Sequence, residues 1–124
     1  MSIAVGTQRA TARWLPRELV GRELMAKFFR ALGDPTRLAL VEFCAQGERT
    51  GTDCVLNSGL SQGRVSAHLG CLVSCGLITV RREGRFAYFQ VTDPRVLELL
   101  RVSQQKVADQ AASIAACTRV GPTR

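Results

Sequence analysis

Residues 52–76 read TDCVLNSGLSQGRVSAHLGCLVSCG, and this stretch decides the fold class. A short helix is expected over 52–57, closed at Gly59, because Gly commonly ends helices. Ser61 then caps a longer helix that runs to about Cys75, where a second glycine stops it. A short helix, a tight turn with Gly and a longer helix are typical of a helix-turn-helix.

A β-hairpin is predicted directly after the longer helix. Residues 77–80 and 86–91 are rich in β-branched and aromatic side chains, and the polar turn Arg82-Glu-Gly-Arg85 separates them. Runs of this composition around a turn that contains Gly form hairpins. We therefore expect a wing beside the helix-turn-helix.

Three further helices are expected outside this motif. Apolar residues recur at helical spacing over 17–32, which predicts an amphipathic helix. Asp-Pro pairs at 34–35 and 93–94 each supply an N-cap with Pro at the first helical position. The first of these two helices runs to about Ala45. The second continues to Ile114, with an apolar stripe longer than one small domain needs to cover, which suggests a dimer interface.

The length of 124 residues fits a single domain. We predict a mainly α fold with a β-hairpin wing, a winged helix-turn-helix that forms a homodimer. The domain is expected over 18–117, with dimerisation helices at both ends. A flexible arm over 1–17 and a frayed tail over 118–124 would flank it.

The composition points to a nucleic-acid partner. The formal net charge is +7, and a basic imbalance of this kind commonly marks a protein that binds a polyanion. The basic residues are spread along the chain instead of collected on one amphipathic helix, which disfavours a membrane surface. No apolar run approaches the roughly 20 residues that cross a bilayer, and no signal-peptide pattern is present. A cytoplasmic protein without a membrane partner is expected.

The longer helix of the motif has an inner and an outer face. Val65, Leu69 and Leu72 recur at i, i+4 and i+7 and should face the core. Polar residues between them then turn outward, where Arg and Gln suit guanine and adenine edges and Ser suits a base or a phosphate. An ordinary solvated helix face is the alternative. Together with the wing, the predicted DNA-binding residues are Ser61, Gln62, Arg64, Ser66, His68, Arg81, Arg82 and Arg85.

Two of the five cysteines, Cys71 and Cys75, lie four residues apart on the same helix. Side chains at i and i+4 are about 5–6 Å apart at Cβ, close enough for both sulfurs to bind one ion. Two small buried hydrophobes are the alternative, since free Cys is among the most buried residue types. Leu69 and Leu72 already supply the inner face, which favours metal ligands. His68, three residues before Cys71, would either join a mixed Cys/His site or contact DNA or backbone.

Four stretches occur in a characteristic order. They are Phe29-Arg-Ala-Leu-Gly-Asp-Pro-Thr-Arg-Leu38, Val65-Ser-Ala-His-Leu69 followed by Leu72, Gly76-Leu77, and the Arg82-Glu-Gly-Arg85 wing. They cover roughly residues 24–100 and resemble the ArsR/SmtB family of metal-sensing repressors. The resemblance implies a homodimeric winged helix protein that binds an operator upstream of metal-resistance genes and releases it when metal binds. His followed by Leu is common in members that sense different metals, which favours a DNA or backbone contact for His68.

The stretch Cys71-Leu-Val-Ser-Cys75-Gly-Leu77 resembles the thiolate pair of the cadmium- and lead-sensing actinobacterial branch of this family. That branch completes a three-sulfur site with a cysteine from the C-terminal region, and Cys117 is the only candidate. Three thiolates without oxygen or imidazole donors would select Cd(II), Pb(II) or Hg(II) over Mn(II), Ni(II) or Co(II). Two sulfurs alone would still satisfy Hg(II), which accepts linear coordination. The expected effector is therefore a soft metal ion, and no organic cofactor is expected.

The remaining two thiols, Cys44 and Cys54, lie outside this site. Cys44 follows Phe43 near the end of a helix and is expected in the core. Cys54 falls where arsenic- and antimony-sensing relatives carry clustered cysteines, but their Cys-x-Cys arrangement is absent. A repressor that responds to arsenic or antimony through Cys54 and Cys44 is an alternative function.

Other functions are disfavoured. Zinc-sensing relatives use His and carboxylate ligands near the C-terminus, whereas residues 94–124 hold no His and only Glu98 and Asp109 as carboxylates. A thiol redox regulator is a second alternative, although Cys71 and Cys75 one turn apart are a poor lever for a disulfide switch. An enzyme would need an activated thiolate, but the helix C-terminus raises the pKa of a thiol such as Cys75. We expect no catalysis.

Overall fold

The computed structural model describes residues 17–121 of the chain. Helix α2 (Arg17–Leu32) opens this range. Residues up to Arg30 form one unit and residues from Ala31 onward form a second, which contains the helix-turn-helix and the sheet. Except for Arg17, the predicted arm over 1–17 lies outside the described residues, as do residues 122–124 of the predicted tail.

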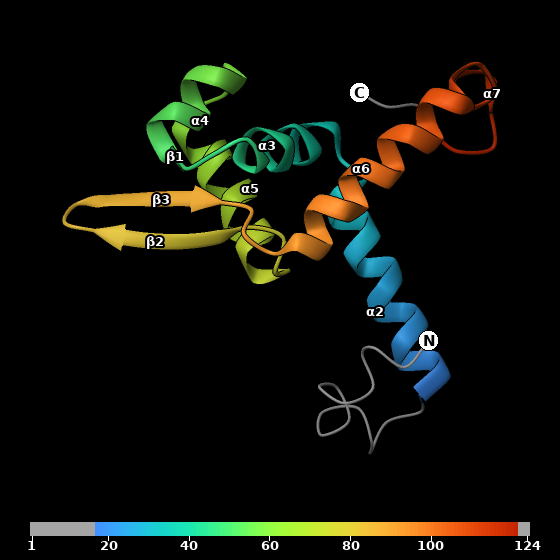
Figure 1. The fold of residues 1–124 in the computed structure, drawn as a ribbon, viewed down its shortest axis with the longest axis horizontal. Coiled ribbons are helices and arrows are strands. Elements are labelled where there is room, and N and C mark those ends of the chain that lie inside the picture. The colour runs from blue at the N-terminus through green and yellow to red at the C-terminus, as the bar shows by residue number, and fades with distance from the viewer. Residues whose placement is uncertain (1–16, 122–124) are drawn as a thin grey trace. The chain divides into compact units, whose positions relative to one another are not determined.

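Three helices of the second unit, α3 (Pro35–Ala45), α4 (Gly51–Ser58) and α5 (Gln62–Ser74), cluster beside the sheet (Figure 1). The side chains of Asp34, Thr50 and Ser61 cap them, each accepting a hydrogen bond from the backbone N–H three residues later. These caps satisfy N–H groups that a helix start leaves unpaired, so they fix where each helix begins. The predicted helix-turn-helix, formed by α4 and α5, is confirmed.

The sheet is antiparallel and has the strand order β1-β3-β2. Its strands are β1 (Arg49–Thr50), β2 (Thr79–Glu83) and β3 (Phe86–Gln90). Strands β2 and β3 form the predicted wing, which extends beyond the helices in Figure 1. Gly84 has φ +61°, as the first loop residue of a type II′ hairpin turn requires. Strand β1 was not predicted, because two residues are too short for a periodic pattern and form a strand only by pairing with β3.

The core of this unit lies between α3, α4, α5 and the base of the wing. Val65, Leu69 and Leu72 on α5 are 1%, 3% and 0% exposed, which confirms their predicted inward face. The core also contains Leu40, Val41, Cys44, Cys54, Leu77 and Ile78, each with less than 2% exposure. Burying one aliphatic side chain contributes about 1.5–3 kcal/mol, so this core holds α5 in place and leaves its opposite face at the surface.

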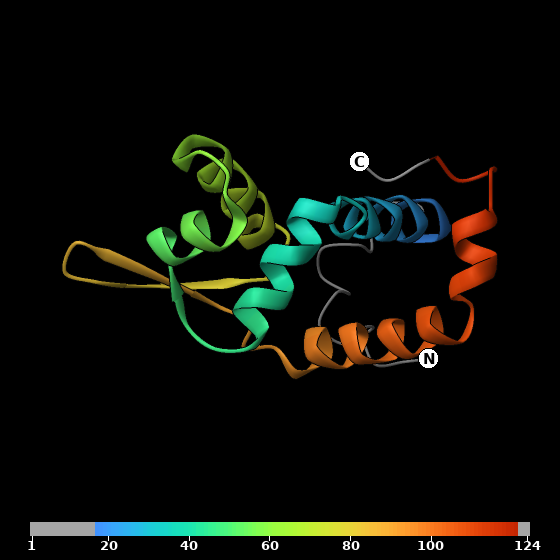
Figure 2. The same ribbon diagram turned by 90° about the horizontal axis from the view of Figure 1, so that it is seen from above.

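The final predicted helix is two helices, α6 (Pro94–Asp109) and α7 (Ala111–Ala116). Gln110 separates them with non-helical angles of φ −123° and ψ 18°, and Figure 2 shows α7 turning away from the axis of α6. The apolar spacing continues across this break, so the sequence pattern does not reveal it. Within these helices only Val96 and Leu100 are buried, and every residue over 101–121 is exposed.

Candidate nucleic-acid interface and thiol sites

The outer face of α5 carries the polar residues that the sequence predicts there. Gln62, Arg64 and Ser66 are exposed. Ser61 is also exposed, but its hydroxyl accepts a hydrogen bond from the Arg64 N–H at 3.2 Å and so caps the helix. Helix α5 therefore presents hydrogen-bonding side chains to solvent while its opposite face is packed in the core.

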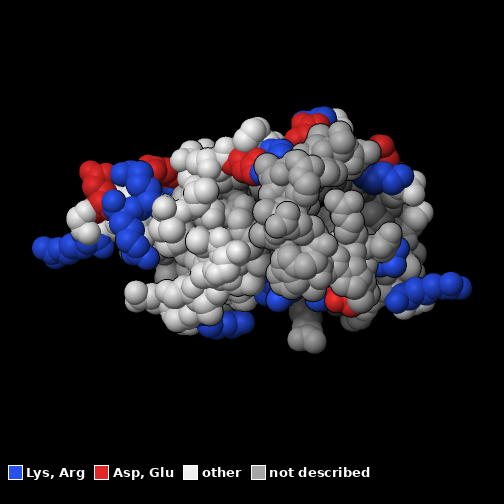
Figure 3. All heavy atoms as spheres, turned by 90° about the horizontal axis from the view of Figure 1, so that it is seen from below, with Lys and Arg blue, Asp and Glu red and all other residues white. Residues whose placement is uncertain are grey.

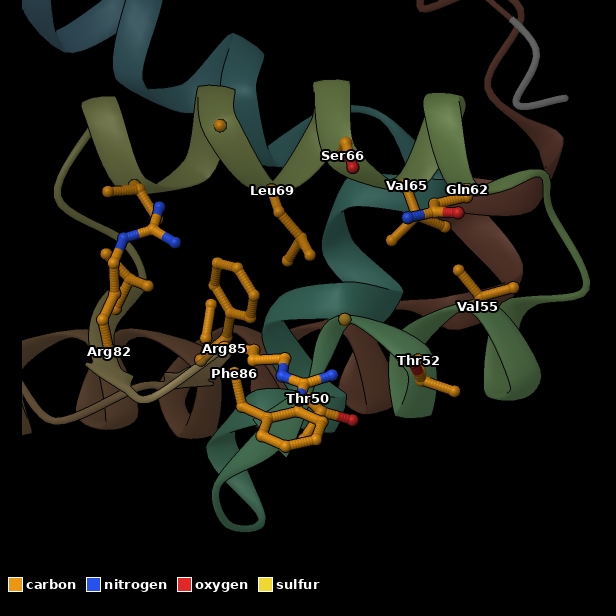
Figure 4. Close-up of a pocket in the computed structure, with 16 residues that line it drawn as sticks. Thr50, Thr52, Val55, Gln62, Val65, Ser66, Leu69, Arg82, Arg85 and Phe86 are labelled. Atoms are coloured by element: carbon orange, nitrogen blue, oxygen red, sulfur yellow. The ribbon is translucent and has the colours of Figure 1, made fainter.

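A groove of about 600 Å³ runs between α5, the start of α4 and the wing. Gln62 and Ser66 line its α5 wall, and Figure 4 shows them across from Arg82 and Arg85 of the wing. Leu69 and other apolar side chains lie between the two polar walls. The structure thus brings four of the eight predicted DNA-binding residues to one groove. Arg64 is exposed outside its lining.

The three wing arginines differ in their surroundings. Arg81 forms ion pairs with Glu48 and Glu83, and its guanidinium carbon lies 4.5 Å from the centroid of the Tyr88 ring. Arg82 and Arg85 are exposed, and no carboxylate among residues 17–121 forms a salt bridge with either. Basic and acidic side chains lie together at the hairpin end of the molecule in Figure 3. The charges of Arg82 and Arg85 therefore remain available to a polyanion.

His68 is placed differently from the other predicted DNA-binding residues. It is half-buried, and α5 packs against α3. The predicted DNA contact of His68 therefore stays a prediction.

Cys71 and Cys75 stand one helical turn apart at the end of α5, as predicted. The Cys75 N–H donates to the Cys71 carbonyl at 3.0 Å, so helical spacing continues to the C-cap. Gly76 follows with φ +76°, and the Leu77 N–H donates to the Leu72 carbonyl at 2.9 Å. This is a Schellman motif, which fixes the end of the helix. Cys71 is exposed and Cys75 is half-buried, so neither is a fully buried core residue.

Cys117 is exposed at the C-cap of α7. Hydrogen bonds from the backbone N–H groups of Val120 and Arg119 lower the pKa of its thiol, which favours the thiolate form that binds metals. Across residues 17–121, however, no three His, Cys, Asp or Glu side chains come together as a metal site. One chain alone therefore does not assemble the predicted trio of Cys71, Cys75 and Cys117.

The other two cysteines meet inside the core. Cys44 on α3 and Cys54 on α4 are each 0% exposed, and their side chains share a hydrogen bond. This hydrogen bond, together with burial, raises the pKa of Cys44, whereas the same bond lowers the pKa of Cys54. The core position predicted for Cys44 is confirmed. All five cysteines are described, and none forms a disulfide.

Comparison with known proteins agrees with this fold. A family model for "Bacterial regulatory protein, arsR family" matches residues 34–80. A probable mercury resistance operon repressor from Streptomyces lividans is 50% identical over 95 residues, which cover 77% of this chain and 76% of the relative. The chain belongs to the arsR family of bacterial regulatory proteins.

Two further relatives of this arsR-family regulator support the assignment. The HTH-type transcriptional regulator CmtR of Mycobacterium tuberculosis is 33% identical over 99 residues, which cover 72% of this chain and 84% of that protein. A homodimeric winged helix-turn-helix DNA-binding domain from Mycobacterium bovis superposes with a TM-score of 0.69 and 31% identity, covering 77% of this chain and 88% of that structure. The predicted winged helix-turn-helix fold is confirmed.

Two other expectations concern catalysis and the membrane. The family consists of regulators, which confirms that this arsR-family protein is not an enzyme. Across the described range 17–121, none of the helices combines the length and the apolar character needed to span a membrane.

Proposed function

We propose that this arsR-family regulator is a repressor that binds operator DNA as a homodimer and leaves it when a soft, thiophilic metal ion binds its cysteines. The observation that carries the proposal is the 50% identity with a probable mercury resistance operon repressor. A thiol pair on α5 supports it, because a ligand there would act directly on the DNA-reading helix. The proposed place of action is the cytoplasm.

Operator DNA would meet α5 and the wing. Gln62, Arg64 and Ser66 would face base edges in the major groove, where one good bidentate contact contributes about 1–3 kcal/mol of discrimination. Arg82 and Arg85 would contact phosphates, which supply affinity without sequence preference. Ser61, His68 and Arg81 are weaker candidates, because Ser61 caps α5, His68 is half-buried and Arg81 is ion-paired.

The proposed partner of α6 and α7 is a second copy of the chain. Leu97, Val102 and Val107 on α6 are 40%, 46% and 49% exposed, and Ile114 on α7 is 51% exposed. Covering apolar surface contributes roughly 25 cal/mol per Å², so a dimer would gain from burying this stripe. Exposed Leu24 and other apolar residues of α2 support the proposed domain over 18–117 with dimerisation helices at both ends.

Cys71 and Cys75 are the proposed metal ligands on α5, and a purely thiolate donor set fits Cd(II), Pb(II) or Hg(II). Cys117 would complete a three-sulfur site. Because the described part of one chain does not gather three ligands, we propose that this third thiolate comes from the other subunit of the dimer. The bound ion would link α5 to the dimer interface through metal–sulfur bonds.

Release would follow from a shift between two dimer shapes. The metal-free shape would match two half-sites about 34–36 Å apart, and metal binding would favour a shape that does not match. A coupling free energy of about 1–3 kcal/mol changes affinity about 5- to 150-fold. A small displacement of the two copies of α5 would therefore be sufficient.

The test is DNA binding with and without metal. DNA duplexes that the protein selects from a random-sequence pool serve as operator, and fluorescence anisotropy follows the complex while HgCl2, CdCl2 or lead acetate is added to the reduced protein. At least one ion should release the wild type, and failure of all three would overturn the function. Where Cd(II) or Pb(II) releases the wild type from DNA, the variant Cys71→Ser/Cys75→Ser should stay bound to DNA. Release of this variant by the same ion would overturn the ligand assignment.

A further inference from the structure

Cys44 and Cys54 form a second thiol pair, which the proposed function does not use. One thiol comes from the last turn of α3 and the other from α4. Both side chains are 0% exposed, α3 packs against α4, and each thiol is the largest influence on the pKa of the other, so the two sulfurs lie next to each other. Because the fold already brings the two thiols together, they could hold a metal ion without rearrangement of the helices.

The surroundings of this pair provide no third ligand. Within residues 17–121, no group of three His, Cys, Asp or Glu side chains could hold a metal ion. Asp53 directly precedes Cys54 in the sequence, but its carboxylate accepts the Thr50 N–H at 2.8 Å in the α4 capping box. Contact with Cys54 and burial raise the pKa of Cys44, and the charge of Arg49 offsets only part of this rise. The pair is therefore a two-thiolate donor set in an apolar core.

We propose that Cys44 and Cys54 bind one Hg(II) ion in linear, two-coordinate geometry, at a site separate from Cys71 and Cys75. Each thiol loses its proton and forms one sulfur–mercury bond. Starting from HgCl2, two chloride ions and two protons leave, and no electron is transferred. Two thiolates satisfy Hg(II), whereas an ion such as Zn(II) is almost always four-coordinate in structural sites. The buried pair therefore selects Hg(II) over ions that need three or four donors.

Binding at this site would change the junction between α3 and α4. The sulfurs of a linear S–Hg–S unit lie farther apart than two hydrogen-bonded thiols, and a close-packed core gives little room for that separation. Because α4 packs against α5, a displacement of α4 would reach the reading helix. This regulatory consequence rests on the proposed function, whereas mercury binding itself does not.

The experiment measures mercury bound to the reduced protein without DNA. HgCl2 is added in the presence of excess monothiol, which competes for isolated cysteines, and dialysis and ultraviolet charge-transfer absorption report the bound ion. Cys71→Ser/Cys75→Ser/Cys117→Ser should retain one Hg(II) per chain and bind no Cd(II). Adding Cys44→Ala should abolish mercury binding. A triple variant without Hg(II), or retention after Cys44→Ala, would overturn the proposal, and equal binding of Cd(II) would overturn its selectivity.

Two controls keep this test independent of folding and of DNA release. Val41→Ala in the triple variant truncates another side chain of α3 with 0% exposure and should leave mercury binding intact. Wild-type protein whose exposed cysteines have been blocked with N-ethylmaleimide should still take up one Hg(II), more slowly than unblocked protein, because a buried site fills only through local opening. Absence of this uptake would contradict the site. Since no DNA is present, either result leaves the proposed function to be judged by its own test.

Discussion

Arg81 on β2 holds Glu48, which precedes β1, by two hydrogen bonds. The Arg81 Nε lies 2.8 Å from the Glu48 Oε2, and a terminal guanidinium nitrogen lies 3.0 Å from the Oε1. Strand β3 lies between β1 and β2, so the pair reaches across the sheet. Because both side chains are exposed, we expect this ion pair to have little effect on stability. The Glu48 carboxylate nevertheless neutralises one positive charge of the wing.

Glu48→Gln should strengthen DNA binding. Loss of the carboxylate makes the wing more positive by one charge while Arg81 keeps its ion pair with Glu83. We expect a gain of about twofold to fivefold at low salt that fades as salt is raised. Anisotropy titrations at several salt concentrations measure this gain. Glu98→Gln is the matched control, since it removes an ion-paired carboxylate on α6. An equal gain in the control would mean that only net charge matters.

Arg82→Gln and Arg85→Gln should weaken binding to every DNA sequence. Each lost phosphate contact should make the slope of log K against log salt shallower by about 0.9. Arg95→Gln, which removes an arginine already paired with Asp93, should change the slope much less. Unchanged slopes in both wing variants would show that the wing does not contact phosphates.

Gln62→Ala should reduce specificity and leave general affinity intact. A side chain that reads a base edge contributes about 1–3 kcal/mol of discrimination, so operator binding should weaken about 5- to 150-fold while random-sequence DNA is bound as before. Competition titrations with both duplexes measure the ratio. Gln105→Ala on α6 is the control. A parallel loss on both duplexes would indicate a backbone contact instead.

Asp34→Ala should destabilise the protein by about 0.5–2 kcal/mol, the usual cost of losing an N-cap. The Arg37 N–H donates to the Asp34 carboxylate at 3.0 Å and lowers its pKa below the ordinary value of 3.8. A lowered pKa means that this contribution is complete above pH 3.8 and is lost as the pH falls through the folded-state pKa. Urea unfolding should therefore separate the two proteins at neutral pH, and the gap should shrink in acid. A gap that does not depend on pH would contradict this role.

Val107→Glu should shift the protein from dimer to monomer. Val107 is 49% exposed in the single chain, and a carboxylate at this position would be buried without a partner in the proposed interface. Analytical ultracentrifugation over a concentration series measures the dissociation constant. Gln105→Glu adds the same charge on the opposite side of α6 and should leave the dimer intact. Equal dissociation of both variants would point to a general charge effect.

The sequence alone determined where most elements begin and which face of α5 is buried. Asp34, Ser61 and Asp93 cap helices at the predicted places, and Cys71 and Cys75 are one turn apart because helical spacing is fixed. These features depend on hydrogen bonds within a few residues, so local chemistry is sufficient to predict them.

Only the tertiary structure decided which distant groups meet. It paired β1 with β3, brought Cys44 to Cys54, joined Arg81 to Glu48 and left Cys117 apart from Cys71 and Cys75 within one chain. No sequence spacing encodes these relationships, because they follow from how helices and strands pack to bury the shared core. Packing therefore separated Arg81 from the available wing arginines and placed Cys44 and Cys54 together in the core.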